Sequence, residues 1–117
     1  MKLRSIVKSK EFIPTFNGND ELPADEKIVI NITRFPTNAE AAKYKTYKFD
    51  GSGSLELVFR DEIMLPAHVG KIKNLSDDEG PIDSGAALSR STNLLLDGLI
   101  AEIRQYLLDS EELEPGE

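Results

Sequence analysis

The sequence predicts a single α+β domain in which a small antiparallel sheet is packed by a long C-terminal helix and one or two short helices. Two segments with alternating apolar residues, 27–34 and 55–60, indicate strands. Apolar residues at three- and four-residue steps over 85–108 indicate the long helix. A chain of 117 residues fits one domain with one modest core. We expect residues 1–108 to form it and the acidic residues 109–117 to form a flexible tail.

The first third of the chain is expected to contain two strands and a loop. Residues 3–8 can start a strand, and residues 17–26 form a loop because Asn, Gly, Asp and Pro each favour turns. Residues 27–34 are the clearest strand in the chain, since β-branched content and a period of two agree there. One face of this strand holds Ile28, Ile30 and Ile32.

The middle of the chain is expected to hold a short helix and a strand. Thr37 and Glu40 have the spacing of a capping box, which predicts a helix start followed by a helix to about Tyr44 or Tyr47. Lys43, Lys45 and Lys48 would then lie on or near its exposed side. Residues 49–54 form a turn. A strand over 55–60 follows, with Leu55, Leu57 and Phe59 on one face.

Two further helices are expected in the last half. Proline is tolerated in the first turn of a helix, so the first should begin near Pro66 and turn Val69 and Ile72 inward. The acidic segment 76–84 reads as a loop. Ser84 or Asp83 would cap the second and longest helix, 85–108.

The residue types that most enzymes use are scarce in this chain. Cysteine is absent, which excludes disulfides, thiolate nucleophiles and Cys-ligated metals. His68 is the one histidine, and we expect it to be a surface or partly packed helix residue. Gly51 and Gly53 are followed by neither a lysine nor a helix, so the phosphate-loop pattern is not met. We therefore predict a protein that is not an enzyme, with no catalytic, cofactor-binding or metal-binding residues.

Two polar loops could supply oxygen ligands to a cation. Neither loop has the ligand spacing of the twelve-residue calcium loop, so we interpret both as solvated turns. Cation binding by residues 77–83 stays open. The acidic loop contains Asp77, Asp78, Glu79 and Asp83, and the other contains Asn17, Asn19, Asp20 and Asp25.

Charge and hydropathy limit the partners. The net charge of −7 disfavours nucleic acid, because an acidic domain repels phosphates. No apolar stretch approaches the ~20 residues of a membrane span, and no signal-peptide pattern is seen at the N-terminus. We expect a soluble intracellular protein that binds neither membranes nor nucleic acid.

The long helix suggests where a protein partner could bind. Its apolar stripe is wider than the ~100° that one core contact requires. Such a stripe usually faces a core, but part of it could serve a partner or a further copy of this chain. The candidate interface residues on this helix and the neighbouring loops are Leu88, Leu95, Leu96, Leu99, Ile103, Phe16 and Leu22.

The order of several short phrases resembles a known family. Pro14, Phe16, Asn17-Gly18-Asn19 and Leu22-Pro23 are followed by the alternating strand and then by Pro36, Thr37 and Glu40. Residues 69–75 and 99–113 extend the similarity over most of the chain. This order is similar to that of the tail assembly chaperones of long-tailed bacteriophages.

The resemblance implies a function in virion morphogenesis. Such a chaperone, in the host cytoplasm, would hold components around the tape measure protein soluble while tail tube subunits polymerise. It needs no cofactor, only apolar surface and a charge that keeps it soluble. Two alternatives stay open: an acidic phage-encoded inhibitor or adaptor that binds a host protein, and a minor structural protein of the virion.

Overall fold

A three-stranded antiparallel sheet forms the base of the molecule. The computed structural model describes residues 10–108, so the predicted strand 3–8 and tail 109–117 lie outside the described residues. The sheet order is β1 (Lys10–Phe12), β2 (Val29–Ile32) and β5 (Val69–Lys73). Ile30 pairs with Ile72, and both are buried. The strand expected in 27–34 is confirmed, because its alternation turns Ile30 and Ile32 into the core.

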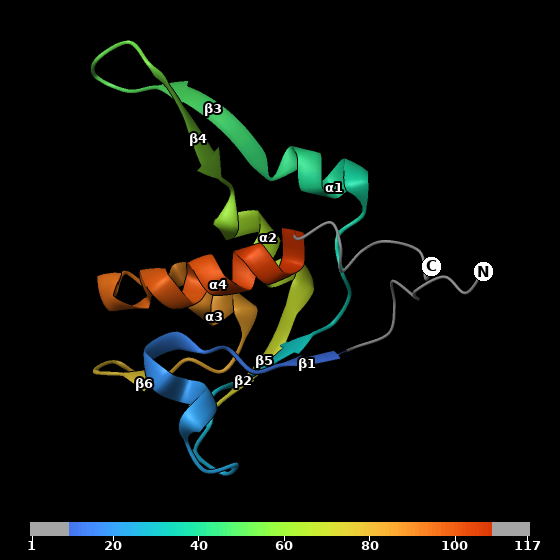
Figure 1. Cartoon of the computed structure of the whole chain (residues 1–117), viewed down its shortest axis with the longest axis vertical. Coiled ribbons are helices and arrows are strands. Elements are labelled where there is room, and N and C mark those ends of the chain that lie inside the picture. The colour runs from blue at the N-terminus through green and yellow to red at the C-terminus, as the bar shows by residue number, and fades with distance from the viewer. Residues whose placement is uncertain (1–9, 109–117) are drawn as a thin grey trace, which may run out of the picture.

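Helices pack beside this sheet and complete the core (Figure 1). They are α2 (Asp61–His68), α3 (Gly85–Arg90), the 3₁₀ turn η2 (Leu94–Leu96) and α4 (Asp97–Leu108). Tyr106 of α4 stacks on Phe12 of β1, with ring centroids 4.1 Å apart. The core is lined largely by branched aliphatic side chains from both layers, as the α+β prediction requires. The fold class is therefore confirmed.

The predicted helix 85–108 is two helices. Ser84 caps α3, since its hydroxyl accepts a hydrogen bond from the Ala87 amide. The chain leaves the helical conformation at Ser91, and the Asn93 side chain then accepts from the Leu95 amide to start a new turn. Ser, Thr and Asn compete for backbone hydrogen bonds, so the Ser91-Thr92-Asn93 run ends one helix and begins another.

The helix expected to begin near Pro66 was placed wrongly. Pro66 lies inside α2, which ends at His68, and the residues that follow form β5. Val69 and Ile72 are buried as expected, but in a strand. Gly70 leaves room for the side chain of Asn31, because a Cβ there would lie 2.8 Å from Asn31 Oδ1.

A second, two-stranded sheet projects from the body as a hairpin (Figure 1). It consists of β3 (Lys45–Phe49) and β4 (Leu55–Phe59). The capping box of Thr37 and Glu40 is confirmed at the start of α1 (Asn38–Lys43). That helix ends at Lys43, with Tyr44 as its C-cap, so Lys45 and Lys48 lie in a strand and not on a helix. The strand predicted over 55–60 is confirmed as β4.

The predicted loops also contain short elements. Residues of the first polar loop form the 3₁₀ segment η1 (Phe16–Glu21). The acidic loop contains a small hairpin of β6 (Ser76–Asp77) and β7 (Gly80–Pro81). Among residues 10–108, no helix has the length and apolar character needed to cross a membrane.

Candidate protein-binding surface

The β3–β4 hairpin presents an apolar face to solvent. Its strands pair Tyr47 with Leu57 and Phe49 with Leu55. Since directly opposite residues of an antiparallel pair share a face, these four side chains form one continuous surface, which we call the hairpin face. The side chains are 65, 71, 64 and 42% exposed for Tyr47, Phe49, Leu55 and Leu57, respectively. An exposed apolar cluster of this kind is a candidate interaction site.

The turn that joins the two strands is fixed by one carboxylate. Asp50 accepts hydrogen bonds from the Ser52 hydroxyl at 2.6 Å, the Ser52 amide at 2.8 Å and the Ser54 amide at 3.1 Å. The Ser52 hydroxyl and these amides lower the pKa of the Asp50 carboxyl, because they stabilise its charged form. Gly53 adopts a φ of 89°, which glycine reaches at little cost. Local interactions therefore define the hairpin register.

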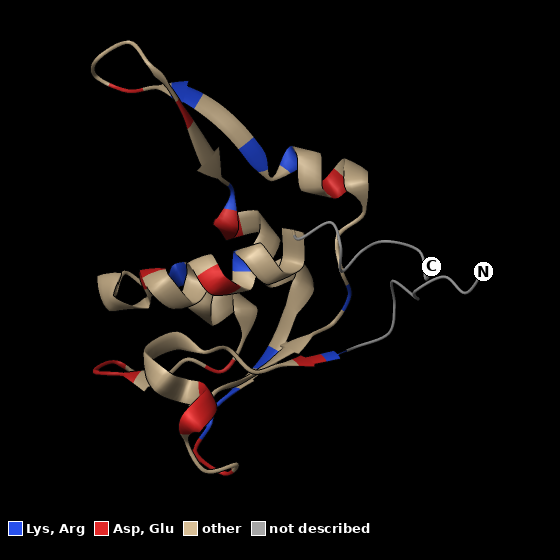
Figure 2. Ribbon diagram, viewed as in Figure 1, with Lys and Arg blue, Asp and Glu red and all other residues tan. Residues whose placement is uncertain are grey.

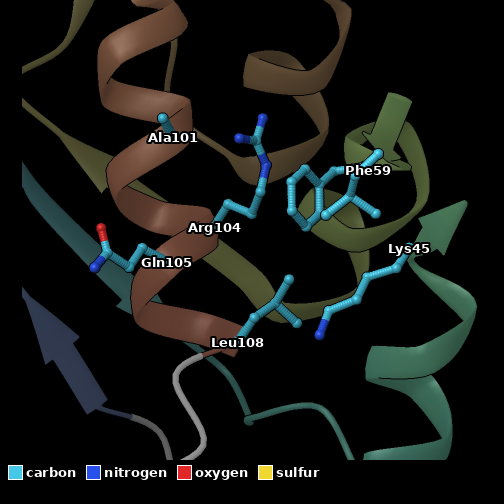
Figure 3. A pocket seen from close by; sticks show the side chains of 7 residues that line it. Lys45, Phe59, Ala101, Arg104, Gln105 and Leu108 are labelled. Carbon is cyan, nitrogen blue, oxygen red and sulfur yellow. The ribbon is translucent and has the colours of Figure 1, made fainter. Parts of the chain in front are cut away.

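Helix α4 braces the base of the hairpin. Arg104 donates to both carboxylate oxygens of Asp61, at 3.1 and 2.7 Å, and its guanidinium lies 4.5 Å from the ring centroid of Phe59. A hollow of about 590 Å³ lies between the hairpin and α4 (Figure 3). It continues the hairpin face to α4 and is lined by Lys45, Leu57, Phe59, Ala101, Arg104, Gln105 and Leu108.

His68 anchors the start of the hairpin from inside the core. The expectation of a surface or partly packed residue was wrong, because the side chain is fully buried. Its Nδ1 lies 3.0 Å from the carbonyl oxygen of Arg34 and its Nε2 lies 2.8 Å from the hydroxyl of Tyr44. A carbonyl can only accept, so Nδ1 bears the proton and Nε2 accepts from Tyr44. Burial lowers the pKa of His68, which favours this neutral form.

An ion pair next to His68 secures α1. Arg34 donates to both oxygens of Glu40, each at 2.6 Å, and the Thr37 amide donates to Glu40 at 3.0 Å. The Arg34 guanidinium and the Thr37 amide lower the pKa of Glu40 to about 2. These partly exposed groups therefore fix the segment from which β3 starts.

In each of the two candidate cation loops, one polar side chain makes structural hydrogen bonds. Asn19 is buried: its Nδ2 donates to the carbonyls of Pro14 and Ile28, and its Oδ1 accepts from the Ile28 amide at 2.6 Å. In the acidic loop, the Asp77 carboxylate accepts from the Glu79 amide at 2.9 Å. Within the described part of the chain, no group of three or more His, Cys, Asp or Glu residues is arranged to hold a metal.

The structure separates the seven predicted interface residues into two groups. Five belong to the core or pack against it: Leu88, Leu96, Leu99 and Ile103 are buried, and Phe16 is partly buried. Leu95 and Leu22 are 80 and 43% exposed. The exposed pair is accessible to a partner, whereas the four buried side chains are occupied within the domain.

Sequence reasoning missed the β3 half of the hairpin face. The alternation of Tyr47 and Phe49 before the Gly-Ser turn, matched by Leu55 and Leu57 after it, is a hairpin pattern. It was obscured because the preceding helix was expected to continue to about Tyr44 or Tyr47. Comparisons of the chain with protein-family models, curated proteins and solved structures give no match. The functional inference therefore depends on this surface and on the sequence resemblance.

Proposed function

We propose that this chain is a non-enzymatic assembly chaperone of phage tail morphogenesis, which binds a tail protein through the hairpin face. The observation that supports protein binding is the exposure of four apolar side chains in two cross-strand pairs on a projecting hairpin. An isolated two-stranded hairpin is marginally stable in water, so covering this face with a partner would stabilise it. The resemblance of the chain to tail assembly chaperones supplies the partner class, the tail tube or tape measure protein.

The polar chemistry of the chain also favours binding over catalysis. His68 uses both ring nitrogens in core hydrogen bonds, and Glu40 and Asp61 are each held by an arginine. A general base must be able to reach a substrate proton, and these groups are committed to the scaffold. A chaperone with this architecture would act in the host cytoplasm, where tail subunits are made.

Co-production with the tail tube and tape measure proteins tests the proposal. The tagged full-length chain should recover one of them and increase its soluble fraction. The double variant Phe49→Ser/Leu55→Ser should lose this recovery while retaining its fold, because both side chains are exposed. The neighbouring cross-strand pair on the opposite face provides a matched control, Lys48→Ser/Glu56→Ser, which leaves the net charge unchanged.

Other outcomes would change the binding surface or the function. Equal recovery by both double variants would exclude the hairpin face. Recovery of a host protein in place of the tail proteins would favour the inhibitor or adaptor, and retention of the chain in purified virions would favour the minor structural protein. Light scattering on the same samples tests for self-association.

A further inference from the structure

The hairpin is locally basic in an acidic protein. Residues 43–60 contain four basic and two acidic side chains, and the pairing of Arg60 with Glu62 leaves a net charge of +1 on this segment, whereas the whole chain carries −7. Figure 2 shows Lys and Arg at the end of α1, along β3 and at the end of β4. Charges are screened beyond about 8 Å at physiological salt, so a partner at the hairpin responds to this local charge and not to the total of −7.

The acids and the arginines at the hairpin base neutralise one another. Asp61 is bound by Arg104 at 2.7 Å, and Glu62 lies 3.3 Å from Arg60. Lys45, by contrast, has no ion-pair partner among residues 10–108. Its side chain borders the hollow and extends toward Leu108 (Figure 3). An uncompensated ammonium therefore lies at the edge of an apolar surface.

We propose that the hairpin face and the adjoining hollow bind an acidic segment of the partner protein, one that bears apolar side chains on one side and carboxylates beside them. The apolar side chains would cover Tyr47, Phe49, Leu55 and Leu57 and enter the hollow. A carboxylate would pair with the ammonium of Lys45. This inference rests on the proposed function, because it names the chemistry of the same docking site.

The same charges disfavour other occupants. A basic segment would place like charges against Lys45, which costs affinity. A second copy that paired through its own hairpin face would bring the two Lys45 side chains to one interface, because a two-fold contact joins identical patches. The remaining rival with suitable chemistry is residues 109–117 of this chain, which hold five acids and Leu113 and follow directly on Leu108.

Peptide binding to the full-length chain tests the proposal. The probes are three synthetic amphipathic helical peptides with identical leucines on one side and Glu, Gln or Lys on the other, measured by fluorescence anisotropy. The Glu peptide should bind most tightly and the Lys peptide least. Lys45→Gln should weaken the Glu peptide about 2- to 5-fold, as expected for an exposed charge pair, and leave the Gln peptide unchanged. Lys48→Gln, on the opposite face, is the matched control.

Three results would overturn the proposal. The first is equal binding of the Glu and Gln peptides, and the second is equal effects of Lys45→Gln and Lys48→Gln. The third is that the Glu peptide binds only to the variant Glu111→Gln/Glu112→Gln/Glu114→Gln and not to the unsubstituted chain. That result would assign the hollow to the chain's own residues 109–117. If any of these occurs while Phe49→Ser/Leu55→Ser still abolishes recovery of a tail protein, the proposed function stands and only the partner chemistry is wrong.

Discussion

Replacing Tyr44 with phenylalanine removes one hydroxyl from the buried anchor of the hairpin. That hydroxyl donates to Nε2 of His68 at 2.8 Å, and both side chains lie in the core. The ring of Tyr44 also packs edge-on against the imidazole, with centroids 5.5 Å apart, and phenylalanine preserves this contact. The substitution therefore isolates the hydrogen bond.

The expected cost follows from the burial of the group left behind. His68 is fully buried, so its Nε2 would lose its partner without gaining access to water. Leaving a buried acceptor unsatisfied costs about 1–3 kcal/mol. In a domain of this size such a loss lowers the melting temperature by on the order of 5–15 °C.

The pH dependence of stability provides a second measurement of the same site. Because burial lowers the pKa of His68 below its ordinary value of 6.5, the unfolded chain takes up a proton before the folded chain does. The stability that the neutral imidazole contributes is therefore present above pH 6.5 and is lost as the pH falls below it. We expect the free energy of unfolding of the unsubstituted chain to decline in that window.

Urea denaturation at pH 8, where His68 is neutral, measures the effect. Tyr47→Phe is the matched control, since its hydroxyl lies on a ring that is 65% exposed and should change stability by less than about 0.5 kcal/mol. If Tyr44→Phe and Tyr47→Phe unfold at the same urea concentration, the hydrogen bond to His68 does not hold the hairpin base as we infer.

Three further predictions address other parts of the scaffold. Asn19→Ala should destabilise the chain by about 2–3 kcal/mol in urea, because it strips partners from the amide and carbonyl of Ile28; no change would mean that water replaces them. Gly85→Ala should lower the free energy of unfolding by about 3 kcal/mol, because its Cβ would overlap two backbone carbonyl oxygens. In the control Gly98→Ala the new Cβ would meet a ring edge at 3.1 Å and the helix propensity would rise, so this variant should melt close to the parent. Similar melting temperatures of the two variants would contradict this packing. The pKa of Glu40 is about 2, so the stability that its ionised carboxylate contributes is present above pH 4.5 and is lost as the pH falls toward 2. Glu40→Gln should therefore make the free energy of unfolding less dependent on pH between 4.5 and 2. An equal pH dependence of the variant and the unsubstituted chain would contradict this prediction.

Elements with local signals were predictable from the sequence. Thr37 and Glu40 satisfy one another's backbone groups whatever the rest of the chain does, and both halves of this capping box are present. Strand β2 is equally clear, because its alternating β-branched residues fit a strand with one buried face. The Ser84 cap belongs to the same class.

Elements whose conformation is decided by distant contacts were not predictable from the sequence. Val69 and Ile72 are three residues apart, a spacing that fits one face of a helix as well as this irregular strand. Pairing with β2 decides in favour of the strand, and Gly70 leaves room for the side chain of Asn31 beside it. The burial of His68 has the same origin, because its partners lie 24 and 34 residues away in the chain. In both cases the deciding partners are distant in the sequence, so no local pattern indicates the contact.

The candidate site was only half predictable for a related reason. A wide apolar stripe indicates that a helix has more than one neighbour but does not say whether the neighbour is the same chain or a partner. Here Leu99 and Ile103 face the domain's own core. Exposed apolar side chains are found at Leu95, which belongs to the predicted stripe, and on the hairpin, where Phe49 and Leu55 are 71 and 64% exposed.

The anchors of the hairpin link its orientation to the stability of the core. Arg104 holds the base through Asp61 and Phe59, and Tyr44 holds the other strand through His68. A face that is preorganised in this way loses less conformational entropy when a partner binds. Tyr44→Phe should consequently weaken partner binding although it alters no exposed side chain, which distinguishes a braced docking hairpin from one that folds only on its partner.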